Sequence, residues 1–418
     1  ATTLTTPSSI TLTGNMTAAG AVALTANSGI SLNNSISTSS GVLNINANSS
    51  TLSLASGITL SSAGALTLAA GSTSSSGGLN LTSTASTINV NNALVSAGAI
   101  NMSAASGLTL SNNTLTAAGN ISLEADSTNS GSGQLNLVSG TTITSSAGSI
   151  ALGATTGGIS STGPLTLNAS NGITVADSLT TAGAVNIYAD TDNNGSGDFT
   201  VSTGSLSTTN NALTVTANDL VLSGTLDSGT GSTTINVSDG GSLGLGFSSG
   251  FGMNITTTEQ GKLVGTGDLS LVNGNITFLA GNSLSHSGKL NIGQSGGTIT
   301  GQGALTLSAA KGLAINSSNL STAGNLSLEG DSNNSTDSDD SISFVSGASL
   351  TASAGSITLN ATTGGISGAG AVNLNATGGI NINDSLTSEG TMTFDADTDN
   401  DGSGTFTIAA SKALTTGS

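Results

Sequence analysis

One residue pattern recurs along most of this chain, and it constrains the fold more than any other feature. Each round runs Gly-x-φ-x-φ, a short spacer, Gly-φ-x-φ, a polar turn and a further apolar residue before the next glycine, where φ is apolar. Residues 98–119 give one round and residues 303–324 another, and in each the opening glycine recurs after 21 residues. A period of this size, with two-residue alternation inside it, predicts a stacked repeat built from strands.

The predicted strands are short. Leu66-Thr67-Leu68 and Leu165-Thr166-Leu167 place an apolar residue on either side of a polar one, so the outer two point to one face of a strand. Helix formers such as Glu, Lys and Arg are scarce. Three strands per round predict an all-β fold, a right-handed parallel β-helix (β-solenoid) of roughly 20 coils of about 20 residues, with the handedness taken from the crossover rule for parallel strands.

The repeat also predicts the domain organisation. Since added coils lengthen a solenoid without making a new core, we expect residues 1–418 to form a single continuous β-solenoid shaft. Residues 98–201 resemble residues 303–408, which predicts an internal duplication. Residues 239–264 break the pattern, with glycines alternating with Leu and Phe, and we expect an irregular junction there.

Charge excludes several classes of partner. The formal net charge is −18 although only 6% of the residues are charged, there is no arginine, and the four lysines are Lys262, Lys289, Lys311 and Lys412. Without a basic stripe, nucleic-acid binding and attraction to anionic lipid are excluded. No apolar run approaches the roughly 18 residues of a spanning helix, so we expect no membrane insertion. The absence of cysteine excludes disulfides and thiolate metal sites.

Two acidic loops are the best candidates for chemistry. Residues 190–198 and 397–404 both begin with the D-x-[DN]-x-[DN]-G opening of a calcium loop, in which alternate side-chain oxygens face a hard cation. Val201 and Ile408 stand at loop position 12, where a bidentate Glu is needed, so a helix-loop-helix calcium site is excluded. The candidate ligands, with calcium as the one expected cofactor, are Asp190, Asp192, Asn194, Asp198, Asp397, Asp399 and Asp401. The alternative is a solvated Asx-rich turn that needs no ion.

Three weaker relatives of these loops are interpreted as occupying the same place in their rounds. Residues 124–129 and 329–334 keep two acids each, whereas residues 70–75 are uncharged. The uncharged version indicates that the fold tolerates this loop without a cation.

Catalytic constellations are nearly absent from the sequence. The single histidine, His286, is interpreted as an exposed turn residue, because a nearby serine is expected by chance in so serine-rich a chain. There is no Trp or Arg, and Tyr188 is the single tyrosine, so the groups that sugar-cleaving sites use are scarce. Phe344, Phe394 and Phe406 fall at inward positions and are expected to fill the core. We expect no catalytic residue; the alternative is a carbohydrate-active β-helix enzyme, a polysaccharide lyase or hydrolase.

Two surface patterns suggest further functions. Thr-x-Thr motifs such as Thr11-Leu12-Thr13 are typical of ice-binding arrays, but here Ser and Asn interrupt them. A calcium-dependent or ice-binding module is therefore kept as a further alternative. Asn-x-Ser/Thr sequons, among them Asn15 and Asn120, are numerous, as expected for this composition.

The coils resemble a known family. The Gly-x-Leu-x-Leu-x-Ala rounds are similar to the β-helical shafts of filamentous haemagglutinin-type exoproteins, which are large bacterial surface adhesins often exported by a two-partner route. Residues 253–271 are similar to a connector that recurs between coil blocks of giant members. The N-terminal region departs from the family, since it has no convincing secretion-domain motif. The resemblance implies a secreted adhesin shaft.

We therefore expect a secreted, cell-surface structural shaft or fibre subunit without catalysis. The chain begins and ends mid-pattern, so the expected partners are other copies of itself, or further coils of a longer chain, stacked end to end. Surface glycans and host or neighbouring cells are further expected partners. The scarcity of Lys and Arg leaves few sites for trypsin-like proteases, which favours an extracellular location.

Overall fold

The protein folds as an all-β parallel β-solenoid. The computed structural model describes residues 1–111, 114–155, 157–335 and 340–417. It has about 18 turns, about 22 residues apart, and almost no helix. The predicted fold class is confirmed, although the turns are fewer and longer than the roughly 20 coils of about 20 residues expected, because several loops lengthen the rounds. The right-handedness stays a prediction.

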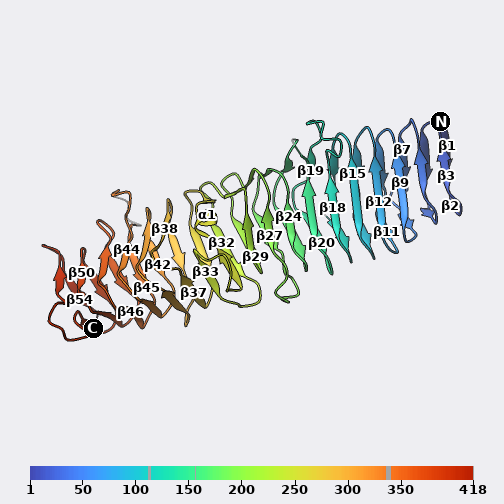
Figure 1. The fold of residues 1–418 in the computed structure, drawn as a ribbon. Coiled ribbons are helices and arrows are strands. Elements are labelled where there is room, and N and C mark those ends of the chain that lie inside the picture. The colour runs from blue at the N-terminus through green and yellow to red at the C-terminus, as the bar shows by residue number, and fades with distance from the viewer. Residues whose placement is uncertain (112–113, 156, 336–339, 418) are drawn as a thin grey trace. The chain divides into compact units, whose positions relative to one another are not determined.

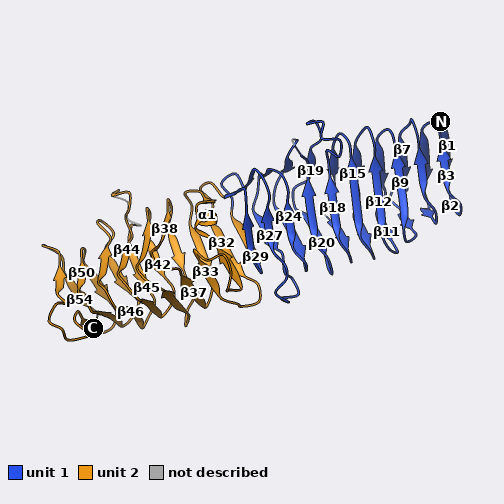
Figure 2. Cartoon of the chain, viewed as in Figure 1, with its two compact units in different colours: residues 1–211, 216–227 blue, residues 212–215, 228–418 orange. Residues whose placement is uncertain are grey.

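The described chain divides into two compact units, residues 1–211 with 216–227 and residues 212–215 with 228–418 (Figure 2). Each unit contains three parallel sheets, and outside residues 239–264 the chain visits them in rotation. The expected continuity of one shaft over residues 1–418 stays a prediction.

In unit 1, neighbouring strands of a sheet come from successive turns (Figure 1). The first sheet contains β1 (Thr2–Thr6), β4 (Val22–Ala26), β7 (Leu43–Asn46), β10 (Leu66–Ala69), β13 (Ile88–Val90), β16 (Leu108–Leu110), β19 (Leu135–Leu137), β22 (Ile159–Ser161), β25 (Leu179–Thr181), β28 (Ser205–Ser207) and β31 (Thr225–Asp227). The second contains β2 (Ile10–Leu12), β5 (Ile30–Leu32), β8 (Thr51–Leu54), β11 (Ser72–Ser75), β14 (Leu94–Ser96), β17 (Thr114–Ala117), β20 (Thr141–Ser145), β23 (Leu165–Ala169) and β26 (Val185–Tyr188). The third contains β3 (Met16–Ala18), β6 (Ile36–Thr38), β9 (Ile58–Ser62), β12 (Leu79–Ser83), β15 (Ile100–Ala104), β18 (Ile121–Glu124), β21 (Ile150–Gly153), β24 (Ile173–Val175), β27 (Phe199–Val201) and β30 (Leu220–Leu222). Strand β29 (Leu213–Ala217) has residues of both units.

Unit 2 repeats this arrangement. Its first sheet contains β32 (Thr233–Val237), β36 (Leu269–Val272), β39 (Leu290–Ile292), β42 (Leu313–Ile315), β45 (Ile342–Phe344), β48 (Ile366–Gly368), β51 (Leu386–Ser388) and β54 (Leu414–Thr416). The second contains β33 (Leu243–Leu245), β34 (Met253–Ile255), β37 (Asn275–Phe278), β40 (Thr298–Gly301), β43 (Asn319–Thr322), β46 (Ala348–Ala352), β49 (Val372–Ala376) and β52 (Met392–Asp395). The third contains β38 (Asn282–His286), β41 (Leu305–Ala309), β44 (Leu326–Glu329), β47 (Ile357–Asn360), β50 (Ile380–Ile382) and β53 (Phe406–Ile408).

The strand register pairs aliphatic residues with aliphatic residues of the neighbouring turns. In the first sheet of unit 1, Leu66 pairs in parallel with Leu43 on one side and Ile88 on the other, and all three are fully buried. Burying one such side chain contributes about 1.5–3 kcal/mol, whereas ordering each residue costs about 1–2 kcal/mol of backbone entropy. A single turn therefore gains stability only from the neighbours that close its core and complete its hydrogen-bond ladder.

Glycine recurs at the bends because successive turns approach closely there. A Cβ added to Gly41 would lie 2.2 Å from the backbone nitrogen of Ala21 in the preceding turn. No side chain fits at that distance, so the position requires glycine. This is the physical basis of the sequence period.

The two stretches that resemble each other in sequence have matching elements. Strands β15–β18 correspond in chain order to β41–β44, and β21–β27 correspond to β47–β53. The common descent of the two blocks by duplication stays a prediction.

Residues 239–264 depart from the three-strand round. Strands β33 and β34 follow each other directly in the chain and pair in parallel, Leu243 with Met253. The helix α1 (Thr257–Gln260) comes next, and a capping box between Thr256 and Glu259 supports its start. Strand β35 (Leu263–Val264) follows.

Inward positions differ in burial along the chain. Phe344 is 3% exposed and fills the core as predicted. Phe406, also predicted to be core, is 41% exposed in β53, where it contacts Phe394 with ring centroids 5.0 Å apart. Leu4 in β1 and Leu414 in β54 are likewise exposed. Within the described residues, no helix is both long and apolar enough to span a bilayer.

Candidate functional site

Four acidic loops share one backbone design. Each begins two residues after a strand ends, with an aspartate that starts a tight turn. The residue three positions later is an asparagine with a positive φ, and its N–H donates to the carbonyl oxygen of the aspartate over 2.9–3.3 Å. Asparagine tolerates this left-handed conformation better than most residues do. The aspartates are Asp126, Asp190, Asp331 and Asp397, and the asparagines are Asn129, Asn193, Asn334 and Asn400.

The aspartate carboxylate closes each loop by accepting backbone hydrogen bonds. In the second loop, Asp190 accepts the N–H groups of Asn194 and Gly195, both over 3.2 Å. In the fourth, Asp397 accepts those of Asp401 and Gly402 over 3.2 and 3.0 Å. Each carboxylate therefore already has a structural role as a turn-forming group.

The first loop shows the electrostatic consequence. Asp126 accepts N–H bonds from Ser130 and Gly131 over 2.9 and 2.8 Å. Desolvation by burial acts to raise the pKa of Asp126, but these hydrogen bonds outweigh it, and the pKa lies below the ordinary value of an aspartate. The ionised form is the one that this loop stabilises.

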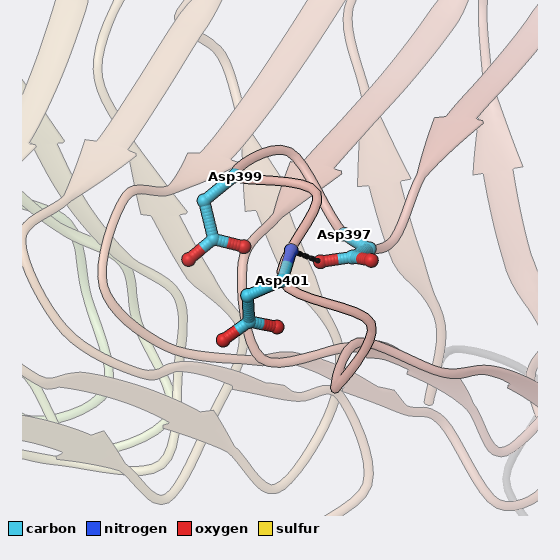
Figure 3. Close-up of side chains that lie close together, drawn as sticks. All are labelled: Asp397, Asp399 and Asp401. Carbon is cyan, nitrogen blue, oxygen red and sulfur yellow. Dashed lines mark hydrogen bonds between the residues drawn. The ribbon is translucent and has the colours of Figure 1, made fainter.

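Among the described residues, a grouping of three acids suited to a metal ion occurs in the fourth loop. One carboxylate oxygen from each of Asp397, Asp399 and Asp401 lies within 4.8 Å of the others (Figure 3). Asp397 is half-buried, whereas Asp399 and Asp401 are exposed. Hydrogen bonds from the side chain and backbone of Ser403 hold the pKa of Asp401 below its ordinary value.

The second loop does not gather its predicted ligands in the same way. Asn194 replaces the third acid, and its side-chain amide donates to Asp192 over 2.9 Å. Asp198 accepts a 2.9 Å bond from the amide of Asn218, one turn further along. Asp190 itself is 2% exposed. Calcium binding at these two loops stays a prediction.

The expected common place of the loops in their rounds is wrong. In unit 1 the first loop follows β18 of the third sheet, whereas the second loop follows β26 of the second sheet. In unit 2 the third loop follows β44 and the fourth follows β52, again strands of two different sheets. The uncharged relative differs further, because Ser72–Ser75 forms strand β11. The loops are thus recurrent turns that follow strands of different sheets, and sequence similarity alone did not distinguish these places.

His286 is not the exposed turn residue that the sequence suggested. It ends strand β38, is 8% exposed, and its Nε2 lies 2.8 Å from the carbonyl oxygen of Gly267. Burial lowers the pKa of His286, while the Gly267 carbonyl and the charge of Asp268 oppose that shift. The histidine therefore serves as a packed, hydrogen-bonded residue between turns.

Two buried aspartates were missed by the sequence reasoning. Asp340 is fully buried, and its Oδ1 has no hydrogen-bond partner. Asp384 is 4% exposed and forms an ion pair of 2.5 Å with Lys412. The sequence did contain a signal for Asp340. When the two duplicated blocks are aligned, Asp340-Ser341-Ile342 falls on Gly133-Gln134-Leu135, so an aspartate stands where the first block has a glycine.

The comparisons with known proteins give no relative. No protein-family model matches the chain, no curated protein matches it, and no solved structure matches it.

Proposed function

We propose that this chain is the non-catalytic structural shaft of a secreted cell-surface fibre or adhesin. The observation that carries the proposal is the solenoid itself, in which each turn repeats the previous one and adds length. Such a body serves to extend or display other parts of a surface protein.

The outward side chains support this proposal. In the first sheet of unit 1, six consecutive members of one outward register column are neutral amides and hydroxyls, namely Asn44, Thr67, Asn89, Thr109, Asn136 and Ser160. Within this column, Ser160 donates its hydroxyl to the side-chain oxygen of Asn136 over 3.0 Å. A surface of this kind stays hydrated without relying on charge.

The finer assignment is to a filamentous haemagglutinin-type shaft. It rests on the resemblance of the coils and of residues 253–271, where the described chain has the β34–α1–β35 departure from the regular round. Export to the cell surface and contact with glycans or neighbouring cells belong to this assignment.

End-to-end association with further coils is the partner that we propose. Exposed apolar residues on the outermost strands, Leu4 in β1 and Leu414 in β54, support it. Such residues match the core of another coil of the same type, supplied by a longer chain or a second copy. A head-to-tail contact of this kind does not close and would build a filament.

The experiment is immunogold labelling of intact source cells with an antibody to this chain, together with negative-stain microscopy of the purified protein. We expect gold at the cell surface, removed by external protease, and filaments in the purified sample. Label confined to the cell interior would refute the surface assignment, and isolated compact particles would refute filament assembly. Turnover of an acidic polysaccharide by the purified protein would replace the shaft with the enzyme alternative.

A further inference from the structure

The third acidic loop contains a carboxylate oxygen that is buried and unpartnered. Asp340 is fully buried; its Oδ2 accepts a 2.6 Å bond from the hydroxyl of Ser335, and its Oδ1 has no partner. An ionised group taken out of water without compensation is costly, so buried charges are normally paired or bound to metal.

Other oxygen atoms lie around Ser335, the hydrogen-bond partner of Asp340. Ser335 donates its N–H to Asp331 Oδ1 over 3.0 Å, so one serine links the two buried aspartates. Thr363, from the next turn, places its Oγ1 3.3 Å from Asp331 Oδ2 and 3.2 Å from the carbonyl oxygen of Ser335. Carboxylate, carbonyl and hydroxyl oxygens are thus linked through Ser335 and Thr363.

The loop carries more negative charge than its two buried aspartates. Glu329 accepts the N–H of Asp331 over 3.2 Å and the amide of Asn360 over 2.5 Å, so a third carboxylate is held beside them. The nearest lysine in the strand order is Lys311, one turn earlier, and it is exposed. Within the described part of the chain, the ion pair found is Lys412 with Asp384, at another loop.

The first loop provides an internal comparison. It has Gly133 where the third loop has Asp340, and its Asp126 is satisfied by N–H bonds from Ser130 and Gly131. That loop closes with its own backbone. The third loop uses the same turn but adds a second buried carboxylate.

We propose that the third loop binds a calcium ion between Asp331 and Asp340. The ligands are Asp340 Oδ1, Asp331 Oδ2, the Ser335 carbonyl and Thr363 Oγ1, with water completing the shell. Calcium accepts such irregular sets of six to eight oxygens, whereas magnesium requires near-octahedral geometry. The ion supplies the positive charge that the buried pair requires and ties the loop to the next turn through Thr363.

The first experiment is isothermal titration calorimetry, in which the chelator-treated chain of residues 1–418 is titrated with CaCl₂ and, separately, with MgCl₂. The second experiment measures the melting temperature of the same chain in calcium and in chelator. We expect calcium to bind and raise the melting temperature, with at least tenfold weaker magnesium binding. Asp340→Asn should remove one calcium per chain. Asp340→Gly, which copies the first loop, should do the same, and melting in chelator shows that both variants fold.

Two matched variants separate this loop from other sources of charge. Asp399→Asn changes the acid group of the fourth loop and should leave the Asp340-dependent calcium in place. Lys311→Gln tests whether a lysine neutralises the site. The proposal is overturned if both Asp340 variants bind as much calcium as the parent chain. It is equally overturned if Lys311→Gln lowers the melting temperature while calcium has no effect on the parent chain.

Discussion

At the scale of single residues, close approach between backbone segments decides which side chains the loops accept. A Cβ added to Gly197 would lie 2.0 Å from the carbonyl oxygen of Ala189, and one added to Gly404 would lie 1.8 Å from that of Ala396. Backbone atoms cannot yield as a flexible side chain can. These glycines are therefore fixed by packing, in addition to any turn preference.

Gly197→Ala should lower the free energy of unfolding by about 1–3 kcal/mol, the cost of forcing extra volume into a packed site. Gly14→Ala is the matched control, because a Cβ there meets nothing within 4 Å. It should be neutral or stabilise by up to about 1 kcal/mol through the unfolded chain. Urea unfolding of the three proteins checks this, and equal stabilities would show that the loop adjusts freely.

His286 gives a prediction for pH. Burial lowers its pKa in the folded state, so the unfolded chain binds the proton more readily. The histidine therefore costs no stability above its unfolded pKa of about 6.5, and it destabilises the fold as the pH falls from there through the folded pKa. We expect the difference in unfolding free energy between the parent chain and His286→Gln to be constant above pH 7.5 or so and to shift against the parent below about 6.5. A difference that does not vary with pH would contradict this.

At the scale of elements, the main role of the acidic loops is to form turns, and ion binding is an additional role that we propose for some of them. In three of them, Asp126, Asp190 and Asp397, both carboxylate oxygens accept backbone N–H groups. The remaining aspartate, Asp331 of the third loop, accepts one such bond, from the N–H of Ser335. The same motif thus holds the chain between two strands whether or not a cation binds.

Asp190→Ala should destabilise the chain by about 1–3 kcal/mol, because it leaves the N–H groups of Asn194 and Gly195 without their acceptor. Asp192→Ala, at the exposed part of the same loop, should change stability by less than about 0.5 kcal/mol. Hydrogen exchange should show faster exchange at Asn194 and Gly195 in the first variant only. Unchanged protection of these two amides from exchange would contradict the turn-forming role of Asp190.

At the scale of the whole molecule, each turn depends on its neighbours, and the turns are interchangeable where the register is kept. Gly119 stacks on Gly98, its N–H donating to that carbonyl over 3.2 Å. Ile121 of β18 pairs with Ile100 of β15, which pairs in turn with Leu79 of β12. A whole turn therefore starts and ends at equivalent points.

Deleting residues 98–118, one full turn, should leave a folded protein, because Ile121 would then pair directly with Leu79. We expect an unchanged circular-dichroism spectrum per residue and a melting temperature within about 4 °C of the parent, since a change near 1 kcal/mol shifts it by that amount. Deleting residues 98–107, half a turn, should abolish cooperative unfolding, because it brings strands of different sheets into register. Equal tolerance of both deletions would contradict stacking in register.

Sequence reasoning reached the fold because its signal is local. Leu66 and Leu68 flank a polar residue, and the same alternation returns each round, so a buried stack follows from the pattern. It failed for His286 and for the places of the loops, because these depend on which strand precedes them and on what the neighbouring turn presents. The acidic loop around Asp397 was identified from its spacing, whereas the buried Asp340 was not.

The amino-acid pattern alone determined that strands would stack with aliphatic side chains inside, because two-residue alternation and closely approaching glycines are properties of the local chain. Tertiary structure decided where Asp340 lies relative to Asp331 and Thr363. That juxtaposition depends on loop length and on contacts between successive turns, which bring residues far apart in sequence within hydrogen-bond distance.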